Sequence, residues 1–200
     1  MITPILVAAV SYLLGSIPFG YLLVRIFYGE DVRQSGSGNI GATNVSRKSP
    51  LLGILTLLLD ALKGFAAVWL AHVAAPTYPF MSLAALFAVL GHMFPVWLSF
   101  HGGKGVATGL GSFVIIAPKD ILIAVGIFIA IALVFRYVSL ASIVAVASFP
   151  LLVYKMQSYG GSPITLGFIV ATSLLIIVKH HENIRRVLAG TENRIGAKRT

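Results

Sequence analysis

The sequence predicts an all-α protein, a polytopic membrane helix bundle of about seven transmembrane helices. Of its 200 residues, 58% are hydrophobic and 10% are charged, whereas soluble domains average about half apolar and a quarter charged. The apolar residues also come in blocks close to the roughly 20 residues that cross a bilayer as one helix. We therefore expect residues 1–200 to form a single integral membrane domain.

Each expected helix corresponds to one apolar segment. The first segment lacks the basic region and the cleavage site of a secretory signal, so we expect a retained helix that Pro18 kinks. A polar segment over residues 28–50, rich in Gly, Ser and Asn, predicts a loop. The fourth and fifth segments are short because Pro118, Lys119 and Asp120 interrupt them, which leaves five spans with a re-entrant hairpin as an alternative. The apolar segments are residues 1–27, 51–72, 80–100, 106–117, 121–135, 138–154 and 163–178.

The basic residues give the bundle an orientation. Both span counts are odd, so the termini lie on opposite sides, and Lys and Arg favour the cytoplasmic side. With the C-terminus inside, only Lys119 and Lys155 lie outside, and Lys63 lies within a span. We therefore expect the N-terminus outside and the C-terminus in the cytoplasm. The inner basic residues are Arg25, Arg33, Arg47, Lys48, Lys104, Arg136, Lys179, Arg185, Arg186, Arg194, Lys198 and Arg199.

The C-terminal residues 179–200 combine basic side chains with apolar ones at helical spacing. Ile184, Val187 and Leu188 predict a short amphipathic helix on the inner surface, with a solvated basic tail as the alternative. The net charge of +9 is spread over loops that border the spans. This distribution fits anionic lipid headgroups better than nucleic acid.

The residue types exclude several kinds of site. The chain has no Cys, which excludes a disulfide framework, an iron–sulfur cluster, a thiolate zinc site and a Cys nucleophile. His92 and His101 lie too far apart for a helical zinc pair, His180 and His181 are adjacent, and no acidic residue stands suitably beside them. We expect His92 to satisfy a backbone carbonyl inside the bundle. We expect no metal and no cofactor.

Three polar clusters fall on the inner face in this topology: residues 35–44 with Arg47, residues 101–105 and residues 180–186. Glycines let the backbone turn its N–H groups toward an anion, and a following helix start adds a favourable dipole end. One such loop is often only a connection. Two of them, each with a cation, plus a His/Asn/Arg segment on one face predict a single anion-binding pocket.

Two familiar phosphate motifs are excluded. Residues 36–41 spell GxGxxG, but a membrane helix precedes them where the dinucleotide fold requires a strand. The Gly103-Lys104 pair does not form a Walker A loop, because Leu98 and Gly105 stand where that loop requires Gly and Ser or Thr.

One pair of charged residues lies inside an expected span. Asp60 and Lys63 are three residues apart on one helix face, where a lone charge would cost several kcal/mol and pairing relieves that cost. Such a pair is either functional or an internal ion pair that fixes helix packing.

Three stretches resemble the signature motifs of a known family. They read SGSGNIGATN at residues 35–44, GHMFPVWLSFHGGKGVAT at residues 91–108 and HHENIRRVLAGTENRIG at residues 180–196. In the order and spacing of these motifs, and over nearly its whole length, the chain resembles the bacterial acyl-phosphate:glycerol-3-phosphate acyltransferases, the PlsY family. Arg194 stands where we expect Lys in the third motif, which preserves the charge.

The resemblance implies a seven-helix enzyme of the bacterial inner membrane, with its active site on the cytoplasmic face. It would transfer a fatty acyl group from acyl phosphate to the 1-hydroxyl of glycerol 3-phosphate, giving lysophosphatidic acid and inorganic phosphate. Neither coenzyme A nor acyl carrier protein would be the direct donor. Besides these substrates we expect membrane lipid as a partner, no nucleic acid, and a monomer as the working oligomeric state.

The resemblance also implies roles for individual residues. The first and third motifs would contribute to catalysis and acyl-phosphate handling, and the glycine-lysine loop of the second would hold glycerol 3-phosphate. The expected catalytic residues are His180, Asn183 and Ser35. The expected substrate-binding residues are Ser37, Gly38, Asn39, Gly41, Thr43, Asn44, Arg47, Gly102, Gly103, Lys104 and Gly105. The expected structural or supporting residues are Asp60, Lys63 and Glu192.

Elementary chemistry fits this assignment. The two reactants together carry about four negative charges, so a partly desolvated site needs cations and oriented amides. Acyl phosphate has a good leaving group, so the substrate hydroxyl attacks directly and no acyl-enzyme is needed. No G-x-S-x-G elbow surrounds Ser35 or Ser37, which we therefore expect to bind phosphate. The general base is either His180 or a phosphate oxygen of the substrate itself.

Two other classes of function are the alternatives. A transporter for phosphorylated solutes would need a polar site near the bilayer midplane and related halves of the chain. The glycine-rich clusters lie at one surface and no internal repeat is visible. The other alternative is a non-enzymatic lipid-binding or assembly protein, which would be inert toward acyl phosphate.

Overall fold

The computed structural model describes residues 3–196 and contains only helices, turns and irregular backbone over that range. This confirms the all-α fold class. The chain divides into two compact units, Met1–Ile116 and Ala117–Thr200, which are described separately. The single integral domain over residues 1–200 stays a prediction.

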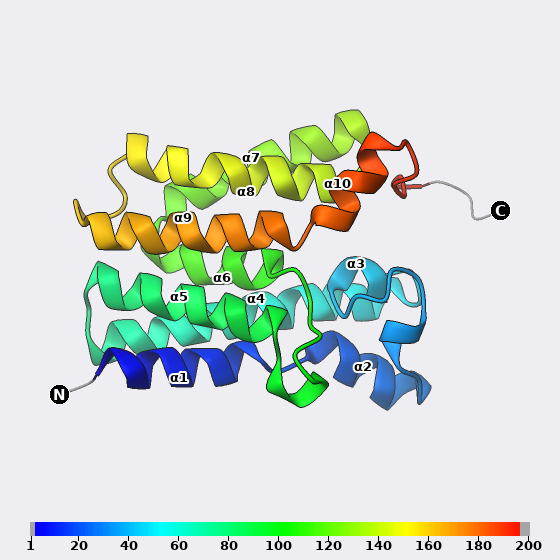
Figure 1. The fold of residues 1–200 in the computed structure, drawn as a ribbon, viewed down its shortest axis with the longest axis horizontal. Coiled ribbons are helices and arrows are strands. Elements are labelled where there is room, and N and C mark those ends of the chain that lie inside the picture. Colours follow the sequence, from blue (N-terminus) through cyan, green and yellow to red (C-terminus); the bar gives the residue numbers. More distant parts are fainter. Residues whose placement is uncertain (1–2, 197–200) are drawn as a thin grey trace. The chain divides into compact units, whose positions relative to one another are not determined.

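From residue 3 onward, the first unit is built from five long helices (Figure 1). Helices α1 and α5 pack side by side, and so do α4 and α6. Short helical turns lie in the polar connections. The long helices are α1 (Pro4–Gly15), α2 (Phe19–Tyr28), α4 (Pro50–Ala74), α5 (Tyr78–Met93) and α6 (Val106–Ile116), and the short ones are η1 (Val32–Gln34), α3 (Ala42–Val45) and η2 (Val96–Leu98).

Proline and its neighbours set several of these boundaries. Helices α1 and α4 begin with Pro at the first position, and the hydroxyls of Thr3 and Ser49 accept hydrogen bonds from the first turn. The predicted kink at Pro18 is a break between α1 and α2. The third apolar segment, predicted over residues 80–100, is α-helical only to Met93, because Phe94 precedes Pro95 and leaves the α-helical region, and the short η2 follows.

Helices α4 and α6 approach each other closely through two glycines. A Cβ atom on Gly111 would lie 1.8 Å from the carbonyl oxygen of Ala61, and one on Gly64 would lie 2.1 Å from that of Thr108. Small residues at a helix crossing are typical of membrane bundles, where close backbone packing replaces the hydrophobic effect as the cause of association. The α4–α6 contact therefore depends on these two positions.

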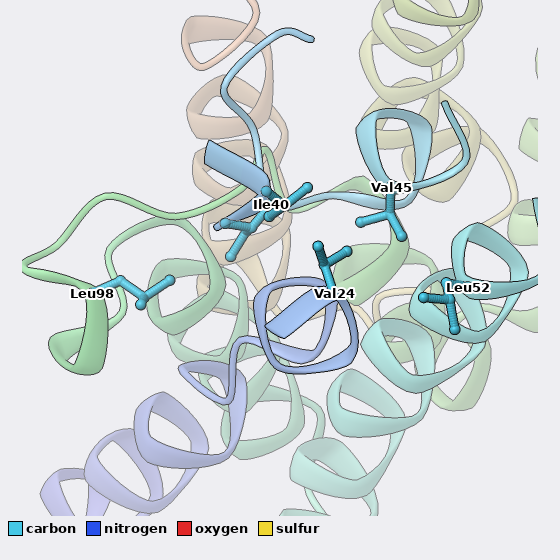
Figure 2. Packing of buried hydrophobic residues seen from close by; sticks show 6 residues of the cluster. Val24, Ile40, Val45, Leu52 and Leu98 are labelled. Carbon is cyan, nitrogen blue, oxygen red and sulfur yellow. The ribbon is translucent and has the colours of Figure 1, made fainter. Parts of the chain in front are cut away.

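A cluster of buried apolar side chains anchors the polar connections of the first unit. Figure 2 shows Val24 of α2 pointing toward Ile40 and Val45, with Leu98 on one side and Leu52 on the other. Ile40 belongs to the first polar cluster, and Leu98 precedes the second. The same apolar cluster therefore anchors both polar connections, the one that contains Ile40 and the one that follows Leu98.

Up to residue 196, where its description ends, the second unit contains four helices, of which α8 packs against α7, α9 and α10 (Figure 1). Helix α10 is bent by 53° from α9, across a break at residues 179–180. This confirms a helix within the basic run 179–200, whereas its position on a membrane surface stays a prediction and residues 197–200 lie outside the described range. The helices are α7 (Pro118–Phe135), α8 (Val138–Lys155), α9 (Pro163–Val178) and α10 (His181–Leu188).

The described residues form five spans long and apolar enough to cross a membrane, or six if the bent pair of α9 and α10 is one span. Helix α6, with 11 residues, is shorter than a full span. Large apolar side chains point outward from these helices; Leu133 of α7, for example, is 75% exposed. The multi-span membrane protein is confirmed, while the count of seven and the orientation of the termini stay predictions.

Candidate functional site

The first polar connection, predicted as a plain loop, contains η1 and α3 and is organised around one side chain, that of Asn44. Its Nδ2 donates to the carbonyl oxygens of Val32, Ser35 and Asn39 at 2.9–3.1 Å, and its Oδ1 accepts from the Ser37 N–H at 2.9 Å. Asn44 is 4% exposed. Its amide is thus used inside the loop, and Asn44 determines the shape of residues 35–44.

Several backbone donors of the loop are not used within it. Gly36 and Gly38 adopt φ values of 60° and 69°, which turn the chain in a way that favours glycine. The Gly41 N–H donates to Asn39 Oδ1, but the N–H groups of Gly36, Asn39 and Ile40 have no partner among the described residues. Further exposed polar groups of the loop come from Ser35, Ser37 and Thr43.

Arg47 supplies positive charge to this loop. A Cβ atom on Gly36 would lie 3.2 Å from Arg47 Nη1, so the guanidinium lies against the glycine turn. Each of the three carboxylates among the first unit's described residues is already paired with another cation. Asp31 pairs with Arg33, Glu30 with Lys48 and Asp60 with Lys63, which leaves Arg47 without a carboxylate partner.

The Asp31–Arg33 pair fixes the entry to the loop. Arg33 donates through Nε and Nη2 to both carboxylate oxygens, at 2.7–3.1 Å. These hydrogen bonds from the guanidinium lower the pKa of Asp31 below its usual value. The Asp31 carboxylate also caps η1 by accepting from the Arg33 N–H.

The glycine-lysine segment differs from expectation in how it uses its amides. The Gly102 and Gly103 N–H groups donate to the carbonyl oxygens of Met93 and His92, at 3.1 and 3.0 Å. The prediction that these two amides point toward an anion is therefore wrong. Glycine is needed here because the segment lies directly against α5: a Cβ atom on Gly103 would lie 2.0 Å from His92 Nε2.

The groups of the glycine-lysine segment that can bind an anion lie at its C-terminal end, where α6 begins. Gly105, at φ 84°, leads directly into α6. The first N–H groups of a helix have no intrahelical acceptor and carry a partial positive charge. Lys104 stands directly before Gly105, two residues ahead of the start of α6, and is half-buried.

Asp60, Lys63 and His92 form a buried ionic cluster. Lys63 Nζ lies 2.8 Å from Asp60 Oδ1, and His92 Nδ1 lies 3.6 Å from the same oxygen. The prediction that His92 has no acidic neighbour is wrong. Asp60 and His92 come from α4 and α5, and their proximity is a tertiary contact that no local sequence pattern reveals.

In the second unit, His180 is buried at the break between α9 and α10 and is 2% exposed. Its Nδ1 lies 2.7 Å from the Ile176 carbonyl oxygen. A carbonyl only accepts, so Nδ1 carries the proton and, in the neutral ring, Nε2 keeps its lone pair. Nε2 is therefore the atom that can take a proton from a substrate.

Asn183 and Glu192 are joined by hydrogen bonds. Glu192 Oε1 accepts from Asn183 Nδ2 at 2.7 Å and from Ser139 Oγ at 2.6 Å, while Oε2 accepts from Arg186 Nε at 2.7 Å. Burial raises the pKa of Glu192, but these three hydrogen bonds outweigh it and hold the pKa below its usual value. Glu192 thereby fixes which way the Asn183 amide faces.

The expected site residues thus fall into two groups. The first unit contains residues 35–47 and 102–105. The apolar cluster in Figure 2 includes side chains from the first of these segments and Leu98, shortly before the second. His180, Asn183 and Glu192 belong to the second unit. His92 and Ser139 were not expected among them. Within residues 3–196, no three His, Asp or Glu side chains are grouped so that they could hold a metal ion.

Comparison with known proteins yields consistent matches. Residues 5–190 match the family model described as glycerol-3-phosphate acyltransferase. A protein of that name from Ehrlichia canis (strain Jake) is 51% identical over 94% of this chain and 97% of its own. A second protein of that name, from Geobacter sulfurreducens, is 45% identical over 98% of this chain and 100% of its own length.

Two solved structures are also similar. Both are crystal structures of PlsY (YgiH), an integral membrane glycerol 3-phosphate acyltransferase. The glycerol 3-phosphate form has a TM-score of 0.90 and 40% identity, and covers 96% of both chains. The lysophosphatidic acid form has a TM-score of 0.86 and 38% identity, over 96% of this chain and 95% of the other.

Proposed function

Because the chain belongs to the glycerol-3-phosphate acyltransferase family, we propose that it transfers a fatty acyl group from acyl phosphate to the 1-hydroxyl of glycerol 3-phosphate. The products are lysophosphatidic acid and inorganic phosphate. The solved relatives bind the acyl acceptor in one form and the lysophospholipid product in the other. The enzyme works in the bacterial inner membrane with its site on the cytoplasmic face.

The reaction is a direct acyl transfer. The 1-hydroxyl oxygen forms a bond to the carbonyl carbon of acyl phosphate, and the bond from that carbon to the phosphate oxygen breaks. The hydroxyl proton goes to His180 or to a phosphate oxygen, and the electron pair of the broken bond leaves with phosphate. Neither Ser35 nor Ser37 is a nucleophile in this scheme, and both bind phosphate.

The observation that carries the proposal is the first loop. It combines unused N–H groups at Gly36, Asn39 and Ile40 with a guanidinium, Arg47, that no described carboxylate neutralises. Oriented amides and a fixed cation stabilise a developing phosphate charge without reorganisation. Asn44 shapes this loop, while Ser37, Gly38, Asn39, Gly41 and Thr43 border the anion.

A second set of protein groups binds glycerol 3-phosphate. Lys104 and the first N–H groups of α6 face its phosphate, and Gly102 and Gly103 let the segment fold back against α5. Where His180 is the base, its Nε2 receives the hydroxyl proton, and Asn183, oriented by Glu192, positions the glycerol hydroxyls.

The test is acyl transfer by the purified, reconstituted protein with radiolabelled glycerol 3-phosphate and acyl phosphate or acyl-CoA as the offered donor. We expect labelled lysophosphatidic acid with acyl phosphate alone. Arg47→Gln should lower turnover at least a hundredfold, since removing one transition-state donor costs about 10²–10³ in kcat. The control Arg25→Gln removes an exposed arginine at the end of α2 and should leave turnover unchanged. Activity with acyl-CoA alone would overturn the donor assignment.

A further inference from the structure

The buried cluster of Asp60, Lys63 and His92 lies inside the first unit, and no step of the proposed reaction uses it. Each of these residues is at most 5% exposed. A charged group in the bilayer interior is costly even when paired, and replacing a buried ion pair with apolar residues is often neutral or stabilising. Helix packing alone therefore gives a weak reason for the cluster, and its contacts indicate what else it does.

At one end, Lys63 holds the break between α1 and α2. Its Nζ donates to the carbonyl oxygen of Ile17 at 2.7 Å and lies 5.7 Å from the ring centre of Phe19, the first residue of α2. Helix α2 carries Val24, which packs on Ile40 of the first loop. The ammonium group thereby fixes where α2 starts, and α2 supports the first loop.

At the other end, His92 holds the glycine-lysine segment. Its carbonyl oxygen accepts from the Gly103 N–H at 3.0 Å, and its imidazole occupies the space that a side chain on Gly103 would need. The opposite edge of the ring faces Asp60. The carboxylate is therefore shared between the lysine that fixes α2 and the imidazole that covers the segment before Lys104.

We propose that Asp60, Lys63 and His92 are positioning residues that hold the glycine-lysine segment, and with it Lys104, in the shape that binds glycerol 3-phosphate. This inference rests on the proposed function. The three residues act through the segment they hold and do not touch the substrate. Loss of the cluster should therefore weaken glycerol 3-phosphate binding far more than it slows the chemical step.

The test removes both charges together, in the variant Asp60→Asn with Lys63→Met, so that no uncompensated charge stays buried. Because the chain has no Cys, His101→Cys gives one nitroxide label directly before Gly102. We expect a more mobile label in the double variant. In the unlabelled protein we expect a roughly tenfold higher KM for glycerol 3-phosphate with kcat within about twofold, since small misplacements of binding groups carry costs of this order.

The matched control is Ser112→Ala, which removes a fully buried hydroxyl bonded only to its own helix, at Thr108. It should change neither label mobility nor KM. If the double variant does not fold, His92→Phe provides the same test, because it keeps a ring over Gly103 and removes the nitrogen that faces Asp60.

The outcomes separate this inference from the proposed function. Unchanged label mobility overturns the inference whatever the activity, as does a mobile label with an unchanged KM in an active enzyme. If the native chain does not acylate glycerol 3-phosphate, the proposed function fails, and label mobility alone decides whether the cluster positions the segment.

Discussion

At the scale of single residues, hydrogen bonds decide which atom of a polar side chain faces a substrate. The proton on His180 Nδ1 is directed to the Ile176 carbonyl, so in the proposed reaction Nε2 is the ring nitrogen that would take up the hydroxyl proton. The Asn183 Nδ2 donates to Glu192 Oε1, and this hydrogen bond fixes the orientation of that amide. Both side chains are therefore held in a defined orientation by hydrogen bonds within the second unit.

His180→Gln distinguishes the two candidate bases. Glutamine can still bond to the hydroxyl but cannot take its proton, so if His180 is the base, kcat should fall by about 10²–10⁴-fold. The measurement is steady-state kinetics with acyl phosphate and glycerol 3-phosphate. Near-normal kcat with a raised KM would remove His180 as the base and leave the substrate phosphate in that role.

At the scale of elements, the α4–α6 crossing is the most sterically restricted contact of the first unit. Gly111→Val would force side-chain atoms against the Ala61 backbone, which cannot rotate away. Overpacking of this kind costs about 1–3 kcal/mol, which lowers Tm by roughly 3–10 °C for a chain of this length. The measurement is thermal unfolding in detergent.

The control for this prediction is another glycine inside an apolar helix. Gly126 of α7 has open space where its Cβ atom would lie. Gly126→Val should leave Tm within about 2 °C of the native value, since surface substitutions usually change stability little. Valine has a higher helix propensity than glycine, so equal Tm losses in the two variants would mean that the close approach at Gly111 has no special cost.

The segment after α10 is held by an acid-sensitive contact. The pKa of Glu192 is held below its usual value by the bonds from Ser139, Asn183 and Arg186, so the folded state favours the carboxylate. Its contribution to stability is complete above the usual Glu pKa of about 4.3 and is lost as pH falls through the lowered value. The Tm difference between the native chain and Glu192→Gln should therefore be largest near pH 7 and shrink in acid.

The comparison variant is Glu182→Gln, on the exposed face of α10, where the Glu182 side chain is 67% exposed. It should show a small Tm difference that changes little with pH, because exposed ion pairs contribute little. A Glu192→Gln difference that stays constant as pH falls from 7 to about 2, through the lowered pKa, would contradict the carboxylate's role.

At the scale of the whole molecule, the lengths of the apolar segments and the placement of proline predicted the long helices, because both act locally along the chain. Asp60 and His92 could not be predicted as neighbours, since their contact depends on how α4 and α5 pack. The amide use of Gly102 and Gly103 was mispredicted for a related reason. Glycine permits both an exposed turn and a close approach, and only the position of α5 decides between them.

The predicted topology places the polar clusters of both units on one side of the membrane, and single cysteines can test it because the chain has none. Cysteines at Ser37, His101 and His181 should react with a membrane-impermeant maleimide only in inside-out vesicles. Cysteines at Thr77 and Gln157 should react from the outside of intact cells. All five positions are exposed, so accessibility depends on the side of the membrane.

Lys119 separates full crossing by α6 and α7 from a re-entrant hairpin. Both arrangements leave the positions above on the same sides, but only full crossing brings the exposed Lys119 to the outer surface. Helix α6 is about 16 Å long at 1.5 Å per residue, roughly half the hydrocarbon thickness. We expect outside labelling at Lys119→Cys. A span shorter than the hydrocarbon core is accommodated by local thinning of the bilayer, and polar residues that flank the span extend to the surface. Labelling from neither side would favour the hairpin, and a reversed pattern at Ser37 and Thr77 would refute the orientation.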